Sequence, residues 1–567
     1  MTRTAPLALS PSISREFAFV AVATVVGALL RIWALGRLGL VHFDEGVYAI
    51  SGLWAIGPQG LSGLDPMVVP YAPPGFPFLV GLAFKVLGPS DVAAILVSVT
   101  TGSLAVPAAA WLARRTFGAG AGTAAAALAA LSGFHVAFSR MALTDASFLL
   151  CWLVGLIVAQ RFLERPSATR GIALGIAVGV AQLFKYSGWT LGAVVPLTAV
   201  AIAVSDPSRR TSAYQMRVWG FGLLAAAIAA AMYAPWFAFV ENHGGYRGLL
   251  THHSGYVGSL DSWFGHWSIQ LEQVGALSGG WGWSLAAWLP AVAGAILVRP
   301  DSKGWARSWR GLGLLAMLAA GVFAPTFPWW IGLGWLVMAG RDGSPGRMLL
   351  GVAWIGLSVL TPFYHPYARL WLPIQSLGWI AGAGAIAGLV APGGTAIVRF
   401  GLRSSLLGFC GLAALAQGLW LTPTPSLAER GTGVLAPSDS LRTAVGRALG
   451  DLPPGIPGLR LLARPPATFY LGGRAAARIE PDLDGLLHDQ GEGAWALVDL
   501  AQLRQSGDPA ATTARLLEHW ELVGAYPTTL NPVTLLDVDP AAARGVRPAE
   551  ADAPLWLLRP RRIGGSR

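Results

Sequence analysis

The sequence is poor in charge and almost free of cysteine. Only 12% of its 567 residues are charged, and its two cysteines, Cys151 and Cys410, both lie inside apolar runs. These two positions exclude a disulfide framework and a Cys-x-x-Cys metal site. The part of the chain after residue 422 also lacks a Walker loop, a Gly-x-Gly-x-x-Gly fingerprint and His or Cys residues at metal-ligand spacing.

Apolar sequence is what the chain has in excess. Hydrophobic residues make up 54% of it, and the mean hydropathy is +0.54. Apolar runs of about 20 residues recur, and each is long enough to cross a hydrocarbon core about 30 Å thick. A soluble protein could not bury this much apolar surface, so the sequence predicts a polytopic membrane protein that has the lipid bilayer as its partner.

The net charge of +11 does not indicate nucleic-acid binding. Residues 1–422 carry 25 Lys and Arg against 13 Asp and Glu, whereas residues 423–567 carry 15 against 16. The positive excess lies in short loops between apolar runs, where it reports membrane topology. We therefore expect no nucleic-acid partner.

Thirteen membrane crossings give a consistent charge pattern. With the Arg-rich loops in the cytoplasm, 18 Lys and Arg lie on the inner side and six lie on the outer side before residue 422. This orientation predicts a cell (plasma or inner) membrane protein with a cytoplasmic N-terminus and an extracytoplasmic C-terminal domain. The proposed spans are about 17–36, 91–113, 119–139, 143–162, 170–184, 188–204, 217–240, 281–298, 311–325, 327–340, 347–362, 370–390 and 404–421.

Two domains follow from this pattern. Residues 1–422 form the transmembrane domain, with an outer catalytic loop at 37–90 and a large outer loop at 241–280. Within the first loop, the short apolar run 76–87 is expected to be a helix lying at the outer membrane surface.

Residues 423–567 are expected to form a small soluble α/β domain that serves as a scaffold or docks the acceptor. Its predicted elements are strands at 459–463, 468–471, 494–500 and 533–538 and an amphipathic helix at 512–523.

The unusual polar residues fall on the outer side of this topology. Because charged residues near a membrane are sparse and usually functional, we expect them to line one outward cavity. The candidates are Asp44, Glu45, Tyr48, Tyr71, Arg140, Asp145, Lys185, His252, His253, Tyr364, His365 and Arg369.

Such a set suits the transfer of a sugar from a lipid phosphate. A carboxylate can deprotonate an acceptor hydroxyl or amine. Lys and Arg can bind a phosphate and stabilise the charge that develops as it leaves. A polyprenyl-phosphate-linked sugar donor would fit a site at the membrane boundary, and the acceptor stays unassigned among protein, lipid and cell-envelope glycan.

Four motifs resemble glycosyltransferase family 39, which includes the protein O-mannosyltransferases and the lipid A aminoarabinose transferases. In order along the chain they are Phe43-Asp-Glu-Gly-Val-Tyr48, Tyr71-Ala-Pro-Pro-Gly-Phe-Pro-Phe, Arg140-Met-Ala-Leu-Thr-Asp145 and Phe184-Lys-Tyr-Ser-Gly. The resemblance implies the GT-C fold, here a mainly α polytopic membrane fold of about 13 transmembrane helices. It also implies inversion, with polyprenyl- or dolichyl-phosphate-linked sugars used on the non-cytoplasmic face.

The resemblance also implies roles for the candidate residues. Asp44 would be the general base or the carboxylate that orients the acceptor, with Glu45 its neighbour. Asp145 would be a second cavity carboxylate, and Lys185 would bind the donor phosphate. The phosphate-binding set is completed by Arg140 and Arg369, and the substrate cavity by Tyr48, Tyr71, His252, His253, Tyr364 and His365.

Two positions depart from the aminoarabinose transferases. Tyr71 and Ala72 stand where those enzymes have a Glu-Lys pair whose Glu is associated with a metal, and Val47 stands where they have an Arg. That metal ligand therefore does not carry over, and the chain offers no firm ligand set for a divalent metal. The cofactor and a lipid A acceptor both stay open.

Simpler interpretations exist for most of these residues. Asp44 and Glu45 could mark a solvated loop, and Asp145 could cap the following helix. Arg140 could anchor the chain at the membrane interface, and Lys185 could extend to the lipid headgroups. The adjacent histidines could lie in a solvated loop, and Tyr48 and Tyr71 could be packing aromatics.

Three other functions compete with sugar transfer from a monophosphate donor. An oligosaccharide ligase with a diphosphate donor would favour more outer cations than the six counted. A transporter or flippase of prenyl-linked lipids would favour charges within the spans and internal pseudo-symmetry. A catalytically dead, lipid-binding homologue is the third, and the presence of Asp44, Asp145 and Lys185 argues against it.

Overall fold

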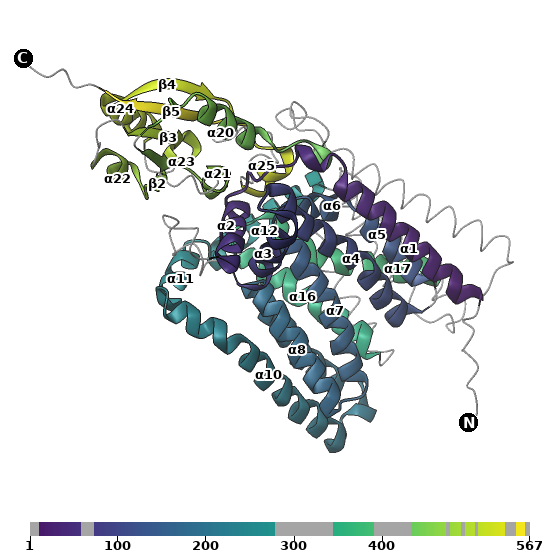
Figure 1. Ribbon diagram of the computed structural model, residues 1–567. Helices are drawn as coiled ribbons and strands as arrows, with labels where there is room; N and C mark the ends of the chain where they lie inside the picture. Colours follow the sequence, from purple (N-terminus) through teal and green to yellow (C-terminus); the bar gives the residue numbers. More distant parts are fainter. Residues whose placement is uncertain are drawn as a thin grey trace, which may run out of the picture.

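The fold consists of a long helical bundle with a small α/β region at one end (Figure 1). The computed structural model describes residues 11–57, 73–118, 120–277, 344–389, 433–456, 458–471, 477–488, 494–504, 508–538 and 552–561. The described helices of the bundle run over residues 11–389, and the sheet is built from strands between residues 459 and 560.

The bundle is built from helices that run roughly side by side and from shorter helices near the α/β region. Its described helices are α1 (Pro11–Ile32), α2 (Phe43–Ile56), α3 (Gly75–Leu87), α4 (Asp91–Phe117), α5 (Ala121–Leu131), α6 (Gly133–Ser139), α7 (Thr144–Glu164), α8 (Ala168–Phe184), α9 (Trp189–Ser205), α10 (Ser212–Glu241), α11 (Gly245–Ser254), α12 (Leu260–Leu277), α16 (Pro345–Leu360) and α17 (Leu372–Leu389).

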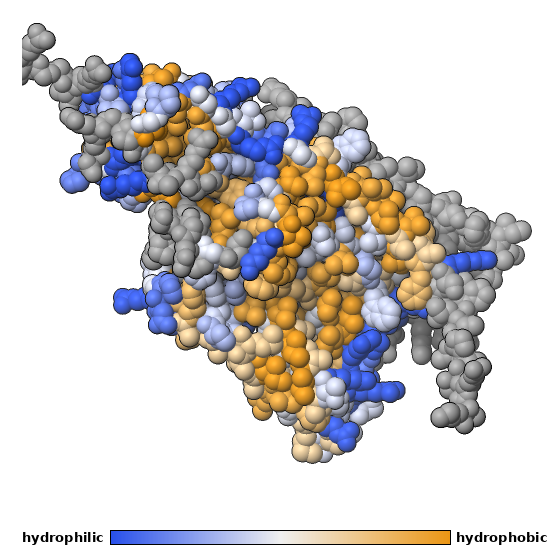
Figure 2. All heavy atoms as spheres, in the orientation of Figure 1, coloured by the Kyte–Doolittle hydropathy of each residue, from blue (hydrophilic) through white to orange (hydrophobic). Residues whose placement is uncertain are grey.

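Six described helices are long and apolar enough to cross a membrane, or seven if the bent pair α5 and α6 is one span. Large apolar side chains on these helices are exposed, such as Leu223 (72% exposed) and Met216 (68%) on α10. Figure 2 shows hydrophobic residues gathered over the bundle and hydrophilic residues over the α/β region and at the opposite end. This distribution is that of a multi-pass membrane protein, in which lipid covers apolar helix faces.

Most predicted spans in the described residues coincide with helices, with differences of detail. The predicted span 119–139 is two helices bent by 57° at Ser132, and α8 is a shorter apolar helix of 17 residues. The predicted outer loop 241–280 is mostly helical in its described part, where it forms α11 and α12. The predicted spans 281–298, 311–325, 327–340 and 404–421 lie outside the described residues.

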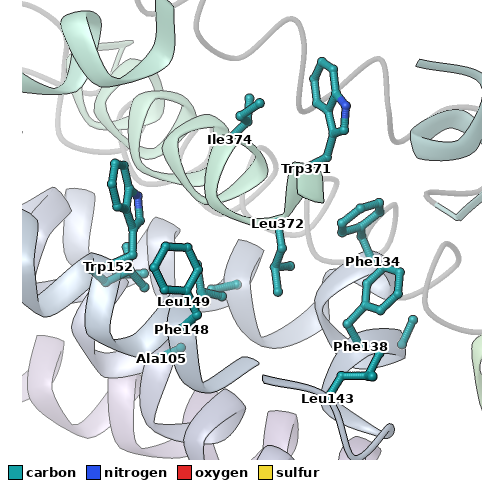
Figure 3. Close-up of a cluster of buried hydrophobic side chains, with 14 of the residues drawn as sticks. Ala105, Phe134, Phe138, Leu143, Phe148, Leu149, Trp152, Trp371, Leu372 and Ile374 are labelled. Atoms are coloured by element: carbon teal, nitrogen blue, oxygen red, sulfur yellow. The ribbon is translucent and has the colours of Figure 1, made fainter. Parts of the chain in front are cut away.

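Bulky buried side chains hold the centre of the bundle together (Figure 3). Phe148 and Trp152 of α7 lie close to Leu372 at the start of α17, and Phe134 and Phe138 of α6 contact each other with ring centroids 5.2 Å apart. All five are buried. Burying a large apolar side chain contributes about 1.5–3 kcal/mol, so this packing fixes α7 relative to α17.

The α/β region contains a five-stranded mixed sheet in the order β2-β1-β3-β5-β4. Strand β1 pairs in parallel with β2 and β3, whereas β5 pairs antiparallel with β3 and β4. Its strands are β1 (Leu459–Leu462), β2 (Ala477–Ile479), β3 (Trp495–Asp499), β4 (Trp520–Tyr526) and β5 (Leu555–Pro560). Its helices are α20 (Ser440–Gly450), α21 (Pro465–Leu471), α22 (Leu483–His488), α23 (Leu500–Arg504), α24 (Pro509–His519) and α25 (Pro532–Val538).

Three predictions for this region were wrong in part. Residues 468–471 and 533–538 are helical and belong to α21 and α25. Proline at the start of each helix explains this, because its fixed φ suits the first helical turn. The predicted helix 512–523 ends at His519, and β4 follows because Trp520–Tyr526 pairs along β5. The predicted strands 459–463 and 494–500 coincide with β1 and β3.

The α/β region is docked on α2 through close backbone contact. A Cβ on Gly46 would lie 2.2 Å from the backbone N of Pro466, so only glycine allows α2 and α21 to approach this closely. Nearby, the Tyr470 hydroxyl accepts a hydrogen bond from the backbone N–H of Leu40 at 2.6 Å and donates to Asp91 at 3.0 Å. The start of α2 is therefore held from both sides, by the bundle and by the α/β region.

Candidate active site

The site begins with the first turn of α2. His42 is the N-cap residue, and its Nδ1 accepts a hydrogen bond from the backbone N–H of Asp44 at 3.0 Å. Glu45 completes a capping box, since its Oε2 accepts from the backbone N–H groups of Val41 and His42, both at 2.9 Å. Its Oε1 accepts from the backbone N–H of Ala142 at 2.8 Å. Glu45 thus fixes the entry of α2, and its predicted catalytic role remains a prediction.

Asp44 pairs with Arg369, which lies 325 residues further along the chain. Arg369 lies in the short helix η7 (Ala368–Trp371), and its Nη2 donates to Oδ2 of Asp44 at 2.7 Å. The side chain of Asp44 is 31% exposed, against 10% for Arg369. Among the described residues, no hydrogen bond reaches Oδ1 of Asp44. Asp44 therefore presents one oxygen to the arginine and has one available to a ligand.

The same arginine contacts a carboxylate of the α/β region. Asp537, on α25, accepts hydrogen bonds from the backbone N–H of Arg369 at 3.0 Å and from its Nη1 at 2.8 Å. Its Oδ2 also lies 3.3 Å from Nε2 of His42, and the same ring nitrogen is 2.8 Å from Nη1 of Arg369. Sequence reasoning did not identify Asp537 or His42 as site residues.

Asp145 and Lys185 lie beside this pair. Asp145 is in the first turn of α7, and its Oδ2 is 3.9 Å from Nε of Arg369. Its Oδ1 is paired with the ammonium of Lys185, the residue that ends α8. The Thr144 hydroxyl donates to the carbonyl of Phe184 at 3.0 Å, which brings the start of α7 to the end of α8. Three carboxylates and two cations thus meet. Four of these residues, Asp44, Asp145, Lys185 and Arg369, are candidates from the sequence, and their catalytic and phosphate-binding roles remain predictions.

Charge within the cluster opposes the effect of burial on ionisation. Burial alone would raise the pKa of Asp537, but Arg369 and His42 lower it to about 2. Burial likewise lowers the pKa of Arg369, but Asp537, Asp44 and Asp145 together raise it above its ordinary value. Both groups are therefore charged at neutral pH. In this buried pair, the attraction between the two charges offsets the cost of removing each from water.

Aromatic and imidazole rings lie close enough to Asp44 for its charge to affect their ionisation. Burial, reinforced by Asp44, raises the pKa of Tyr48, so its hydroxyl stays a hydrogen-bond donor. Nδ1 of His253 lies 2.8 Å from the Tyr364 hydroxyl, and burial lowers the pKa of this histidine. Tyr367 stacks under the guanidinium of Arg369, 4.6 Å from ring centroid to Cζ. These rings offer faces and polar tips to a sugar or an acceptor.

The other predicted cavity residues have different positions. His252 and His253 lie on α11 and not in a loop, and their rings are 5.4 Å apart. His365 contacts Tyr367, with ring centroids 4.4 Å apart, and so belongs to the aromatic group. Tyr71 lies outside the described residues.

Arg140 lies away from the described cluster, at the end of α1. Its Nη1 donates to the carbonyls of Leu30, Arg31 and Trp33 at 3.2, 3.1 and 2.7 Å. These are carbonyls that the end of a helix leaves without intrahelical partners, so Arg140 caps α1. The structure does not bring Arg140 to Asp44, and its predicted contact with the donor phosphate remains a prediction.

Among the described residues, no group of three or more His, Cys, Asp or Glu side chains is arranged to hold a metal ion. The cluster at Asp44 instead alternates carboxylates with cations, which is an arrangement suited to a phosphate and a proton acceptor.

Comparison with known proteins relates this chain and its fold to glycosyltransferases. Residues 71–237 match the family model described as dolichyl-phosphate-mannose-protein mannosyltransferase. This segment includes Asp145 and Lys185 and begins after Asp44. No curated protein matches the sequence at a significant level.

Crystal structures of membrane glycosyltransferases share the fold. ArnT from Cupriavidus metallidurans in the apo state is similar with a TM-score of 0.58 and 18% identity, over 91% of this chain and 97% of that chain. The same enzyme bound to undecaprenyl phosphate is similar with a TM-score of 0.55 and 17% identity, over 96% of this chain and 98% of that chain. The Archaeoglobus fulgidus oligosaccharyltransferase in complex with Zn and sulfate is similar with a TM-score of 0.51 and 13% identity, over 90% of this chain and 72% of that chain.

The chain therefore has the ArnT-like GT-C fold, as the four sequence motifs implied. The family match and the fold together support a GT-C membrane glycosyltransferase.

Signals for the two missed residues were present in the sequence. His42 stands three residues before Glu45 at the start of a helix, which is the spacing of a capping box. Asn531-Pro532 is a helix start, with an N-cap residue followed by proline, and Asp537 is the single acidic residue in the apolar stretch that follows. Their meeting with Arg369 depends on the docking of two regions and had no local signal.

Proposed function

We propose that this protein transfers a sugar from a polyprenyl-phosphate-linked donor to an acceptor on the extracytoplasmic face of the membrane. The observation that carries the proposal is the meeting of Asp44, Asp145, Lys185 and Arg369 from four separate segments. Support for the donor comes from ArnT, which has the same fold and has been crystallised with undecaprenyl phosphate.

Asp44 is the proposed base. Its exposed carboxylate takes the proton of the acceptor hydroxyl or amine as the acceptor atom attacks the anomeric carbon of the sugar. The bond from that carbon to the phosphate oxygen breaks, and the polyprenyl phosphate leaves with the electron pair. A positioned base of this kind contributes about 10²–10⁴-fold to the rate.

Lys185 and Arg369 are the proposed phosphate ligands. Arg369 is paired with Asp44, and Lys185, whose side chain is 19% exposed, is paired with Asp145. As the phosphate leaves it gains negative charge, which two nearby cations stabilise in a site of low dielectric. Lys185 and Arg369 both contact Asp145, which holds them side by side when no phosphate is bound.

The family match favours a monophosphate donor over the diphosphate donor of an oligosaccharide ligase, because the description of the matching family names dolichyl-phosphate-mannose. The transporter alternative has no equivalent support, because the polar cluster gathers at one end of the bundle.

The test is sugar transfer by purified protein from synthetic, radiolabelled polyprenyl-phosphate sugars. Wild type should form labelled product, and Asp44→Asn should be slower by about 10²–10⁴-fold because it removes the base. Asp261→Asn is the matched control, since Asp261 is an exposed carboxylate on α12 outside the cluster.

Equal turnover of wild type and Asp44→Asn would remove Asp44 from the mechanism. An absence of transfer from every monophosphate donor, together with transfer from a diphosphate-linked oligosaccharide, would replace the proposal with the ligase function.

A further inference from the structure

Asp537 reaches the active-site cluster from a part of the chain 168 residues beyond Arg369. Its side chain is fully buried, and both of its oxygens are used. Oδ1 accepts from the backbone N–H of Arg369, and Oδ2 accepts from Nη1 of the same residue. A buried carboxylate that binds one residue through both its backbone and its side chain holds that residue in a single orientation.

We propose that Asp537 is a positioning residue of the active site. It holds one edge of the Arg369 guanidinium so that the other nitrogen, Nη2, contacts only one oxygen of Asp44. The docked α/β region is then a working part of the catalytic site. The catalytic effect of Asp537 rests on the proposed function, whereas its contact with Arg369 is seen in the structure itself.

The geometry of the guanidinium explains why this matters. Arg369 presents Nη1 to Asp537 and to Nε2 of His42, Nη2 to Asp44 and Nε toward Asp145. A guanidinium is a rigid, planar fork that readily binds a carboxylate through two nitrogens. Without Asp537, the Nη1 edge of Arg369 loses its only carboxylate partner among the described residues, and the guanidinium can turn to bind both oxygens of Asp44. That arrangement would occupy the oxygen needed for the acceptor.

Helix α25 is firmly placed for this role. Its first turn is capped by Asn531, whose side chain accepts from the backbone N–H of Thr534 at 2.8 Å. The carbonyl of Leu536 accepts from the side chain of Gln273, on α12 of the bundle, at 2.8 Å. Leu535 and Leu536 are both fully buried. In Figure 1, α25 lies at the junction between the α/β region and the bundle.

The experiment compares Asp537→Asn with Asp499→Asn. Asp499 is a matched control because it is also a buried carboxylate of the α/β region, paired with Arg464 at 2.6 Å. Both variants lose an ion pair, so both should have a lower Tm. Transfer kinetics, the pH profile and thermal unfolding are measured for each.

Only Asp537→Asn should change the chemistry. We expect its kcat to fall by about 10–100-fold, because a small misplacement of a catalytic group has effects of this order. Its KM for the donor should rise by a smaller factor than kcat falls, since Lys185, the other proposed phosphate ligand, is paired with Asp145 and not with Asp537. The acid limb of its kcat/KM profile should move to lower pH, because removal of a neighbouring negative charge lowers the pKa of a carboxylate.

Asp499→Asn should retain the wild-type kcat and pH profile. If Asp537→Asn does not fold, Asp537→Glu takes its place, because it keeps the charge and displaces the carboxylate by one methylene. The same pattern, a fall in kcat that exceeds the rise in KM, is then expected. Wild-type kcat and pH profile in the folded Asp537 variant would overturn the inference and leave the proposed function standing.

Failure of the proposed function itself would be recognised separately. If wild type transfers no sugar, a double-mutant cycle on thermal unfolding with Asp537→Asn and Arg369→Met still tests the contact. Non-additive changes in Tm would support the positioning of Arg369 by Asp537, and additive changes would overturn it.

Discussion

The helical bundle and the α/β region differ in how their functional residues relate to the sequence. In the bundle, Asp44, Asp145 and Lys185 occur in motifs at the ends of long apolar runs, where a charge stands out. In the α/β region, Asp537 is one of many charged residues, and only its buried contact with Arg369 distinguishes it. The difference arises because the meeting of Asp537 with Arg369 depends on how the two regions dock, which no local sequence pattern indicates.

The strongest test of this comparison is Arg369→Met, because Arg369 joins the two regions. It removes the partner of the buried Asp537 and of Asp44. Breaking a buried ion pair costs about 3–5 kcal/mol, so the free energy of unfolding should fall by that order and transfer should be lost. Thermal or denaturant unfolding in detergent measures the first effect. Arg369→Lys keeps the positive charge, so its Tm should lie between those of wild type and Arg369→Met. A Tm of Arg369→Met equal to that of wild type would contradict the account.

A change on the bundle side alone is Lys185→Met. A hydrogen bond to a charged group contributes about 1.5–3 kcal/mol, so polyprenyl phosphate should bind about 10–100-fold more weakly. Stabilisation of the protein by added polyprenyl phosphate gives the change in Kd. Lys185→Arg keeps the positive charge and serves as the control. Unchanged binding by Lys185→Met would place the phosphate elsewhere.

The junction can be disturbed without touching the charged cluster by Gly46→Ala. The added Cβ would lie 2.2 Å from the backbone N of Pro466, and backbone cannot move aside as a flexible side chain can. Overpacking of this kind costs about 1–3 kcal/mol, seen as a lower Tm. Gly446→Ala on α20 is the control, because a Cβ there meets no atom within 4 Å. If the two variants were equally stable, α2 and α21 would not be closely packed.

The smallest expected effect is the pH dependence that Asp537 contributes. Its pKa is lowered from 3.8 to about 2 by Arg369 and His42, against the opposing effect of burial. The stabilisation is therefore present above pH 4 and is lost as the pH falls through 2, and it amounts to at most about 2 kcal/mol. Between pH 4 and pH 2 the wild-type Tm should fall more steeply than that of Asp537→Asn. Parallel curves would show that Asp537 is not paired in the folded protein.

Much of the membrane architecture could be predicted because apolar length and charge act locally. The helices at 91–117, 144–164 and 212–241 lie where apolar runs predicted spans. The break at Ser132 was missed although the sequence marks it, since Ser132-Gly133 is a pair that favours turns and Ser132 is the N-cap of α6.

In the α/β region, local pattern was a poorer guide. The stretch 533–538 is rich in residues that favour strands, yet Asn531 and Pro532 start a helix there and tertiary packing buries it whole. For Arg140, the motif suggested a ligand of the phosphate, but burial at the end of α1 gives it three carbonyl partners. Neither outcome depends on neighbouring residues alone.

An experimental structure of the protein with a bound, non-hydrolysable polyprenyl-phosphate sugar tests the central claim most directly. The account predicts the phosphate within hydrogen-bond reach of Lys185 and Arg369, the anomeric carbon facing Asp44, and Asp537 still bound to the far edge of Arg369. A phosphate bound at the opposite end of the bundle, or a donor that binds with Asp537 withdrawn from Arg369, would contradict it.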